Sequence, residues 1–320
     1  MIRTVLVAAG LTLALTGAPL AVQAQDGHGA AAGHDHDHAA FQSDRLHVRV
    51  DGPQGGTARD IILIPGLSSS PEVWQGTVDH LLGGGGAGWR VHRIHIQGFA
   101  GAPAKGNAEG PVAAPVSEEI ARYIAENNLN KPVVVGHSMG GTIGMMLAAR
   151  HPEAVSRLMV VDMVPFMGAM FGQPGTNPTV ESVTPMADMI HQGMANSPRE
   201  QYQAQADAQI AGMINTGSLR AGPLEDSRTS DQKVSAAAFR ELIVTDLRPE
   251  LGRITAPTTV LYVKFNDPRM TTEMADGIYQ ASFAALPEAA LKRIDDSAHF
   301  IMLDQPEAFY RELDAFLSAE

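Results

Sequence analysis

Short apolar runs alternate with amphipathic stretches along the chain from about residue 46 onward. Runs such as DIILIP at residues 60–65 and VVVG at residues 133–136 are typical of strands that are buried on both faces of a sheet. LHVRVDG at residues 46–52 alternates apolar and polar positions, as an outer strand does. Helical patterns lie between these runs. The alternation predicts an α/β fold, with a mainly parallel sheet and helices on both faces.

Helix-start signals mark two of the predicted helices. Ser70 precedes Pro71 and Glu72 and is expected to cap the helix that follows the first buried strand. Ser117 is expected to cap the amphipathic helix that leads to residue 130. The strand pattern stops between residues 164 and 240, where the segments are mainly helical. We therefore expect a core formed by residues 46–163 and 241–320, with residues 164–240, the cap segment, inserted as a helical cap.

The first residues are not expected to belong to this fold. Arg3 is followed by an apolar run from Val5 to Leu15 and by the small-residue pattern AVQA, which ends at Ala24. This order predicts that residues 1–24 are a signal peptide and that the protein is exported, to the periplasm or the medium. The apolar run is too short to favour a stable membrane anchor. Residues 25–45 contain HGAAAGHDHDH and predict a disordered, His-rich linker.

Charge and composition remove several classes of function. The formal net charge of -12 disfavours nucleic acid as a partner. The chain has no cysteine, which excludes disulfides and cysteine nucleophiles. The alternating His and Asp residues of the linker are able to bind a metal ion loosely, so a metal-binding exported protein is one hypothesis. No fixed metal site is predicted within the fold itself.

The sequence GHSMGG at residues 136–141 lies between a predicted buried strand and a predicted helix. Strand, turn and helix in this order are the context in which G-x-S-x-G forms a nucleophile elbow. Glycines at positions 136 and 140 allow the strand and the helix to cross closely. Ser138 would then occupy a strained bend that holds its hydroxyl out from the sheet, at a helix N-terminus. Ser138 is the candidate nucleophile.

This elbow, together with the arrangement of the elements after residue 45, resembles the α/β-hydrolase superfamily. The resemblance implies a general base after the last strand, and SAHF places His299 at that position. It also implies an acid between the serine and the histidine. Asp267, in the sequence VLYVKFNDP, is the best match, and Asp162, at the end of LMVVD, is the alternative.

The resemblance further implies two main-chain donors for an oxyanion, the N–H groups of Leu67 and Met139. Ser68, Trp74 and Met163 are candidate pocket residues. Seven of the fifteen methionines lie between Met163 and Met213 and favour an apolar, adaptable pocket.

These features predict an enzyme, a serine hydrolase that cleaves small apolar esters through an acyl-enzyme intermediate. The family implies no cofactor for this chemistry. Amide, lactone or peroxyacid chemistry on the same fold is the alternative, because a fold alone does not fix the reaction.

Overall fold

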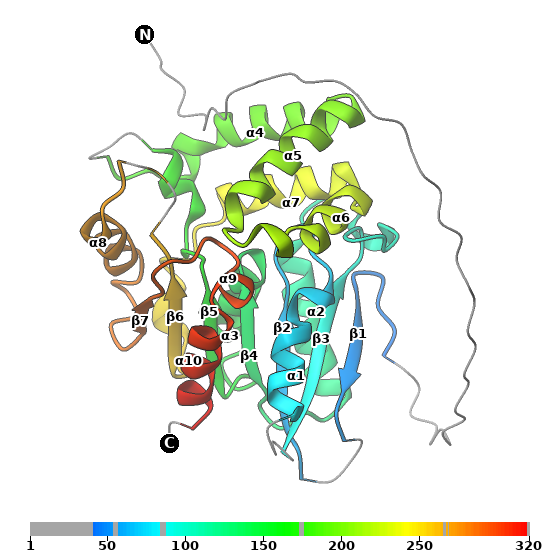
Figure 1. Ribbon diagram of the computed structural model, residues 1–320, viewed down its shortest axis with the longest axis vertical. Coiled ribbons are helices and arrows are strands. Elements are labelled where there is room, and N and C mark those ends of the chain that lie inside the picture. The colour runs from blue at the N-terminus through cyan, green and yellow to red at the C-terminus, as the bar shows by residue number, and fades with distance from the viewer. Residues whose placement is uncertain are drawn as a thin grey trace. The chain divides into compact units, whose positions relative to one another are not determined.

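A single mixed sheet organises the protein in this computed structural model, with strands in the order β1-β3-β2-β4-β5-β6-β7 (Figure 1). Only the edge strand β1 is antiparallel to its neighbour, and the other neighbouring strands are parallel. This confirms the predicted mainly parallel sheet and the outer strand at its edge. The strands are β1 (Leu46–Asp51), β2 (Arg59–Ile64), β3 (Trp89–Ile96), β4 (Val133–His137), β5 (Arg157–Val161), β6 (Thr258–Tyr262) and β7 (Ala290–Arg293).

Helices cover both faces of the sheet (Figure 1). The α-helices are α1 (Gln75–Gly83), α2 (Ala113–Glu126), α3 (Met139–Arg150), α4 (Val180–Asn196), α5 (Arg199–Met213), α6 (Ala221–Thr229), α7 (Gln232–Val244), α8 (Thr272–Ser282), α9 (Ile301–Asp304) and α10 (Pro306–Ser318). Short 3₁₀ turns precede several of them, including η1 (Pro71–Trp74) and η4 (Gly217–Leu219).

Alternate residues of each strand supply two separate apolar cores. Ile62 and Val134 belong to the core that also contains side chains of α2, α3 and α8. Ile61 and Val133 belong to the other core, which contains side chains of α1 and α10. Because successive strand side chains point to opposite faces, continuous apolar runs are required when both faces are covered. The apolar runs from which buried strands were predicted are therefore explained by the helices on both faces of the sheet.

The structure describes residues 41–53, 57–83, 88–172, 176–264, 267 and 269–318. The predicted signal peptide lies outside these residues, as does the His-rich linker up to residue 40. Within the described ranges, no helix is both long enough and apolar enough to span a membrane. Phe41–Glu320 forms one compact unit.

The cap segment contributes α4, α5, α6 and most of α7, which come between β5 and β6 in the chain and gather over one end of the sheet in Figure 1. No strand is found between β5 and β6 in the described residues. The described part of the cap segment is therefore mainly helical, and its role as a cap stays a prediction.

One of the two predicted helix caps is wrong. Ser70 accepts a hydrogen bond from Glu72 N and caps η1, as expected. Ser117, in contrast, is buried inside α2, which begins at Ala113. The N-terminus of α2 is capped from a distance by the buried carboxylate of Glu241, which accepts hydrogen bonds from the backbone N–H groups of residues 112–114 at 2.6–2.9 Å. A cap supplied from α7 leaves no local signal at the start of α2.

Gly136 and Gly140 allow β4 and α3 to meet at van der Waals distance. A Cβ atom added at Gly136 would lie 2.1 Å from the carbonyl oxygen of Gly140, and one at Gly140 would lie 2.2 Å from that of Ile64. Both clashes are with backbone, which cannot move away without shifting a strand or a helix. Gly144, on the same helix, faces only the side-chain ends of Leu158 and Val134, at 3.0 and 3.4 Å.

We expect Gly140→Ala to destabilise the protein by about 3 kcal/mol, because its methyl group must displace the main chain of β2. Gly144→Ala is the matched control. It should change the free energy of unfolding by no more than about 1 kcal/mol, since alanine favours the helix and flexible side chains can yield. Urea unfolding of both variants and the wild type measures this difference. Equal stability of the two variants would contradict the close crossing.

His92 of β3 is buried beside Asp60 of β2 and Tyr123 of α2. His92 Nε2 donates to Asp60 Oδ1 at 3.0 Å, and Nδ1 accepts from the hydroxyl of Tyr123 at 2.7 Å. Burial lowers the pKa of His92 below its usual value of 6.5. The imidazole of His92 therefore takes up a proton near pH 6.5 in the unfolded chain but stays neutral in the folded chain at that pH. As the pH falls below this value, protonation stabilises the unfolded state, and the contribution of His92 to stability is lost.

His92→Gln retains a donor and an acceptor but does not titrate. The free energy of unfolding should therefore decrease less between about pH 8 and about pH 5.5 in His92→Gln than in the wild type. Identical losses in both proteins would show that His92 does not contribute to the pH dependence.

Candidate active site

Ser138 occupies the turn between β4 and α3 with a backbone conformation that side chains rarely adopt. Its φ of 54° and ψ of -121° lie outside the regular regions, and a strained residue of this kind costs on the order of 1–3 kcal/mol. Ser138 N donates to Val161 O at 2.9 Å, which continues the pairing of β4 with β5. The side chain is partly exposed. The predicted strained bend is therefore present at the start of α3.

Asp162 follows β5, the neighbour of β4, and turns sharply at the same edge of the sheet. Its φ is 51°, and its N–H donates to Leu261 O at 2.7 Å. Its Oδ2 atom accepts a hydrogen bond of 2.6 Å from His299 Nδ1. The carboxylate is almost fully buried, with 2% of the Asp162 side chain exposed, whereas 22% of the His299 side chain is exposed. The pair thus has a buried acid and a partly accessible imidazole.

The other oxygen of Asp162 is held by two further donors. Oδ1 accepts from the hydroxyl of Tyr279 at 2.9 Å and from Val263 N at 3.2 Å. Burial, reinforced by the negative charge of Asp162, raises the pKa of Tyr279 well above its usual range, so its hydroxyl remains protonated and able to donate. These bonds fix the carboxylate plane toward His299. Tyr279 lies on α8 and was not among the site residues predicted from the sequence.

The pairing with Asp162 also fixes the tautomer of His299. A carboxylate only accepts hydrogen bonds, so Nδ1 of His299 carries the proton. The neutral ring therefore has its free lone pair on Nε2, which is the atom that a general base requires.

Asp267, the acid favoured from the sequence, is paired with Arg269, whereas His299 is hydrogen-bonded to Asp162. The carboxylate of Asp267 accepts hydrogen bonds from Arg269 Nε at 2.9 Å and Nη2 at 2.6 Å. These bonds lower the pKa of Asp267 to about 2. Because Arg269 is only two positions away, the loop after β6 satisfies the carboxylate locally. The structure brings Asp162, the alternative, to His299.

His137 supports the backbone of His299. Its Nε2 atom lies 3.0 Å from the carbonyl oxygen of His299, and the two imidazole rings are 4.6 Å apart. A carbonyl oxygen only accepts, so Nε2 of His137 donates. Burial and the nearby His299 lower the pKa of His137 well below its usual range. His137 therefore remains neutral. No role for His137 was predicted from the sequence.

The loop after β2 lies beside the elbow, where the oxyanion donors were predicted. A Cβ atom added at Gly66 would lie 3.2 Å from Ser138 Cβ, so the chain just before Leu67 passes close to the candidate nucleophile. Met139, the other predicted donor, is the first residue of α3. Gly66 and Met139 therefore lie beside Ser138 from different elements, and the role of Leu67 and Met139 as oxyanion donors stays a prediction.

The cap segment holds this loop by three hydrogen bonds. Ser68, which has a left-handed φ of 55°, shares a 2.8 Å hydrogen bond between its hydroxyl and that of Ser235 on α7. Ser230 Oγ donates to Ser68 O at 3.5 Å, and Asp226 on α6 accepts from Ser70 N at 2.8 Å. The position of the predicted oxyanion loop therefore depends on α6 and α7.

Two of the candidate pocket residues belong to the core. Trp74 is fully buried and packs against Phe309, with ring centroids 6.1 Å apart. Met163 is 6% exposed and packs in the core on the α3 side of the sheet. Met170 and Met189 of the cap region point to solvent, with 46% and 66% of their surface exposed. These methionines therefore do not form one apolar pocket wall.

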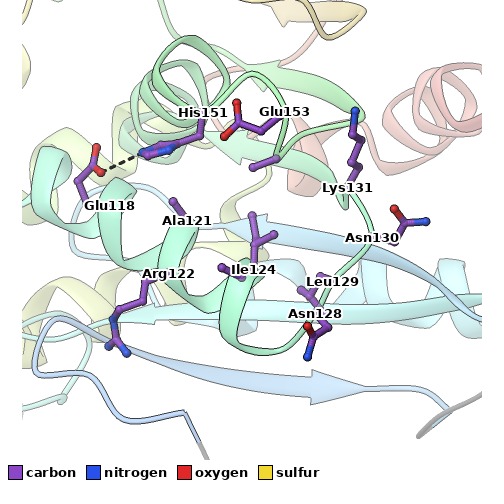
Figure 2. Close-up of a pocket in the computed structure, with 12 residues that line it drawn as sticks. Glu118, Ala121, Arg122, Ile124, Asn128, Leu129, Asn130, Lys131, His151 and Glu153 are labelled. Carbon is purple, nitrogen blue, oxygen red and sulfur yellow. Dashed lines mark hydrogen bonds and ion pairs between the residues drawn. The ribbon is translucent and has the colours of Figure 1, made fainter.

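Figure 2 shows a surface hollow lined by α2 and by the segments that precede β4 and β5. Glu118 and His151 form a 2.9 Å hydrogen bond across it. Because these segments lead into the amino ends of the strands, the hollow lies at the edge opposite Ser138 and Asp162. Among the described residues, no group of three or more His, Asp or Glu side chains is arranged to bind a metal ion.

Comparisons with known proteins place the chain in a family. Residues 61–312 match the Alpha/beta hydrolase family. The pimeloyl-[acyl-carrier protein] methyl ester esterase of Vibrio cholerae is 26% identical, over 82% of this chain and 95% of that protein. The enzyme of the same name from Aromatoleum aromaticum is 27% identical, over 78% of this chain and 94% of that protein.

Solved structures share the fold. An enol-lactonase from Burkholderia xenovorans superposes with a TM-score of 0.66 at 22% identity, over 86% of this chain and 96% of that chain. An esterase from Exiguobacterium antarcticum gives a TM-score of 0.66 at 18% identity, over the same shares of the two chains. The match to the family extends over most of the chain, from β2 to α10. The protein therefore belongs to the alpha/beta hydrolase family and is a hydrolase.

Proposed function

We propose that the protein hydrolyses carboxylic esters through an acyl-enzyme intermediate, with Ser138 as nucleophile, His299 as base and Asp162 as the acid that orients it. The observation that carries this proposal is the 2.6 Å hydrogen bond between His299 and the buried Asp162, at the sheet edge where Ser138 occupies a strained bend. The relatives from Vibrio cholerae and Aromatoleum aromaticum are named as methyl ester esterases, which supports an ester as the substrate.

The first half of the reaction forms the acyl-enzyme. Ser138 Oγ attacks the ester carbonyl carbon while His299 Nε2 takes the hydroxyl proton. The carbonyl oxygen becomes an oxyanion, which the N–H groups of Leu67 and Met139 stabilise; each such donor is worth roughly 3–4 kcal/mol. His299 then gives its proton to the leaving alkoxide oxygen as the C–O bond breaks, so the alcohol departs.

The second half reverses these roles. His299 Nε2 removes a proton from water, whose oxygen attacks the acyl carbon, and the collapse of the second oxyanion releases the carboxylic acid and returns the proton to Ser138. In both halves His299 becomes an imidazolium for a moment. The buried negative charge of Asp162 stabilises that cation, and its hydrogen bond prevents the ring from rotating.

A small ester with an apolar acyl group is the substrate that we propose. The loop beside Ser138 contributes Leu67, and α3 begins with the buried Met139. Amides, lactones and peroxyacids present the same carbonyl to the same groups, so they remain the alternative chemistry for this site.

We also propose that the protein is exported after cleavage behind Ala24. The basic start, the short apolar run and the small residues before Ala24 support this. N-terminal sequencing of the protein recovered from the native cell should give Gln25 as the first residue. Recovery of a chain that still begins at Met1 would contradict export by this route.

The assignment of the three residues is tested by substitution. Ser138→Ala should abolish hydrolysis of p-nitrophenyl esters, and Asp162→Asn should lower kcat by roughly 10⁴-fold because the amide reverses the His299 tautomer. Asp267→Asn is the matched control, since the same change is made in the exposed loop beside Arg269. It should keep wild-type kcat and KM.

A fluorophosphonate probe reports an activated serine without requiring the right substrate, and it should label Ser138 in the wild type and in Asp267→Asn. If no ester, amide or lactone is hydrolysed and Ser138 is not labelled, the serine hydrolase proposal fails. If Asp267→Asn is inactive and Asp162→Asn is active, the acid has been misassigned.

Esters of increasing acyl length then define the pocket, with the highest kcat/KM expected for short apolar chains.

A further inference from the structure

One carboxylate joins the cap segment to the loop that carries His299. Asp304, the last residue of α9, accepts hydrogen bonds from the backbone N–H groups of both. Its Oδ2 atom accepts from Ala298 N and from Asn215 N, each at 3.0 Å. Its Oδ1 atom accepts from Thr216 N at 2.8 Å. Three donors from two distant parts of the chain therefore converge on a single side chain.

The same stretch of the cap segment contacts the His299 loop at two other points. Phe300 N donates to Met213 O at 3.3 Å, on one side of His299. The side-chain amide of Asn215 donates to Asp296 O at 3.4 Å, on the other side. Ile214 is fully buried in the core that contains Phe300. Residues 213–216 thus lie along the loop before and after the histidine.

The N–H group that Asp304 holds on the loop belongs to the residue directly before His299. Movement of Ala298 therefore moves the imidazole relative to Ser138. A displacement of about 1 Å in a catalytic group costs on the order of a hundredfold in rate. The buried carboxylate of Asp162 cannot follow such a shift, because Tyr279 and Val263 fix its other oxygen.

We propose that Asp304 is a positioning residue, which docks Asn215 and Thr216 of the cap segment on the loop of His299 and so sets the place of the base. This inference rests on the proposed function of His299. The cap segment is tied to the oxyanion loop at its other end, through Ser235 and Asp226. Its docking therefore contributes to both loops that surround Ser138.

The first test is Asp304→Asn. An amide has one accepting oxygen in place of two, so at least one of the three N–H groups is left facing an NH₂ group. We expect kcat on p-nitrophenyl esters to fall roughly ten- to a hundredfold, with KM changed by no more than about threefold. The matched control is Asp295→Asn, which removes an exposed carboxylate from the same loop and should leave kcat unchanged.

A second pair of variants breaks the same link from the cap side. Thr216 has a φ of -77°, which proline can adopt, so Thr216→Pro removes the N–H group without forcing that angle. Thr216→Ala keeps the N–H group and serves as its control. We expect Thr216→Pro to lower kcat and Thr216→Ala not to. The double variant Thr216→Pro/Asp304→Asn should have a kcat no lower than that of the slower single variant, because both substitutions break the same link.

Hydrogen exchange supplies a readout that does not depend on activity. The amides of Ala298 and Thr216 should exchange faster in Asp304→Asn, while amides of β4 and β5 remain unchanged. If these amides are unaffected, or if kcat is unchanged in Asp304→Asn and Thr216→Pro while the wild type is labelled at Ser138, the positioning role is wrong. If the wild type itself is neither active nor labelled, the proposed function fails instead, and the exchange data still decide whether the link exists.

Discussion

The hydrogen bond from His299 Nδ1 to Asp162 Oδ2 links elements that are far apart in the sequence but end at one edge of the sheet. It exists because β5, β6 and β7 are parallel neighbours, so the loop after β7 that carries His299 leaves the sheet at the same edge as Asp162 after β5. The left-handed turns at Ser138 and Asp162 then direct both side chains away from the strands. The close crossing of α3 over β4 at Gly136 and Gly140 makes the first of these turns possible.

In the proposed reaction His299 becomes a cation for a moment, and the charges around its bond to Asp162 would stabilise that cation. Asp162 is buried, and its other partners are the neutral Tyr279 hydroxyl and the Val263 N–H group. His137, which lies against His299, remains neutral because burial lowers its pKa. His137 therefore adds no positive charge that would oppose the imidazolium of the proposed reaction. The arrangement follows the general rule that transition-state charge is stabilised by groups that are already in place.

Much of the fold could be predicted from the sequence because both faces of the sheet are covered. The apolar runs at residues 60–65 and 133–136 indicate buried strands for that reason, and GHSMGG indicates the elbow between a strand and a helix. The start of α2 was missed because its cap, Glu241, comes from α7 and leaves no mark near Ala113. Long-range caps of this type are set by packing and not by local sequence.

The partner of His299 could not be chosen from the sequence for a related reason. Asp162 and Asp267 both follow strands of the sheet, so strand order alone does not separate them. The two carboxylates differ in their hydrogen-bond partners. Arg269, two positions after Asp267, offers a local partner, whereas Asp162 turns directly into the core toward His299. Asp304 and Tyr279 were missed because their roles depend on contacts with distant loops.

The cap segment belongs to the same account, since α6 and α7 hold the oxyanion loop while Asn215 and Thr216 lie on the loop of His299. The central claim is that Asp162 holds the Nδ1 proton of His299. Proton NMR of the ¹⁵N-histidine-labelled protein tests it directly. We expect a resonance far downfield of the amide region, assigned to His299 Nδ1–H, that is lost in Asp162→Asn and present in Asp267→Asn. A resonance that survives in Asp162→Asn and disappears in Asp267→Asn would contradict the account.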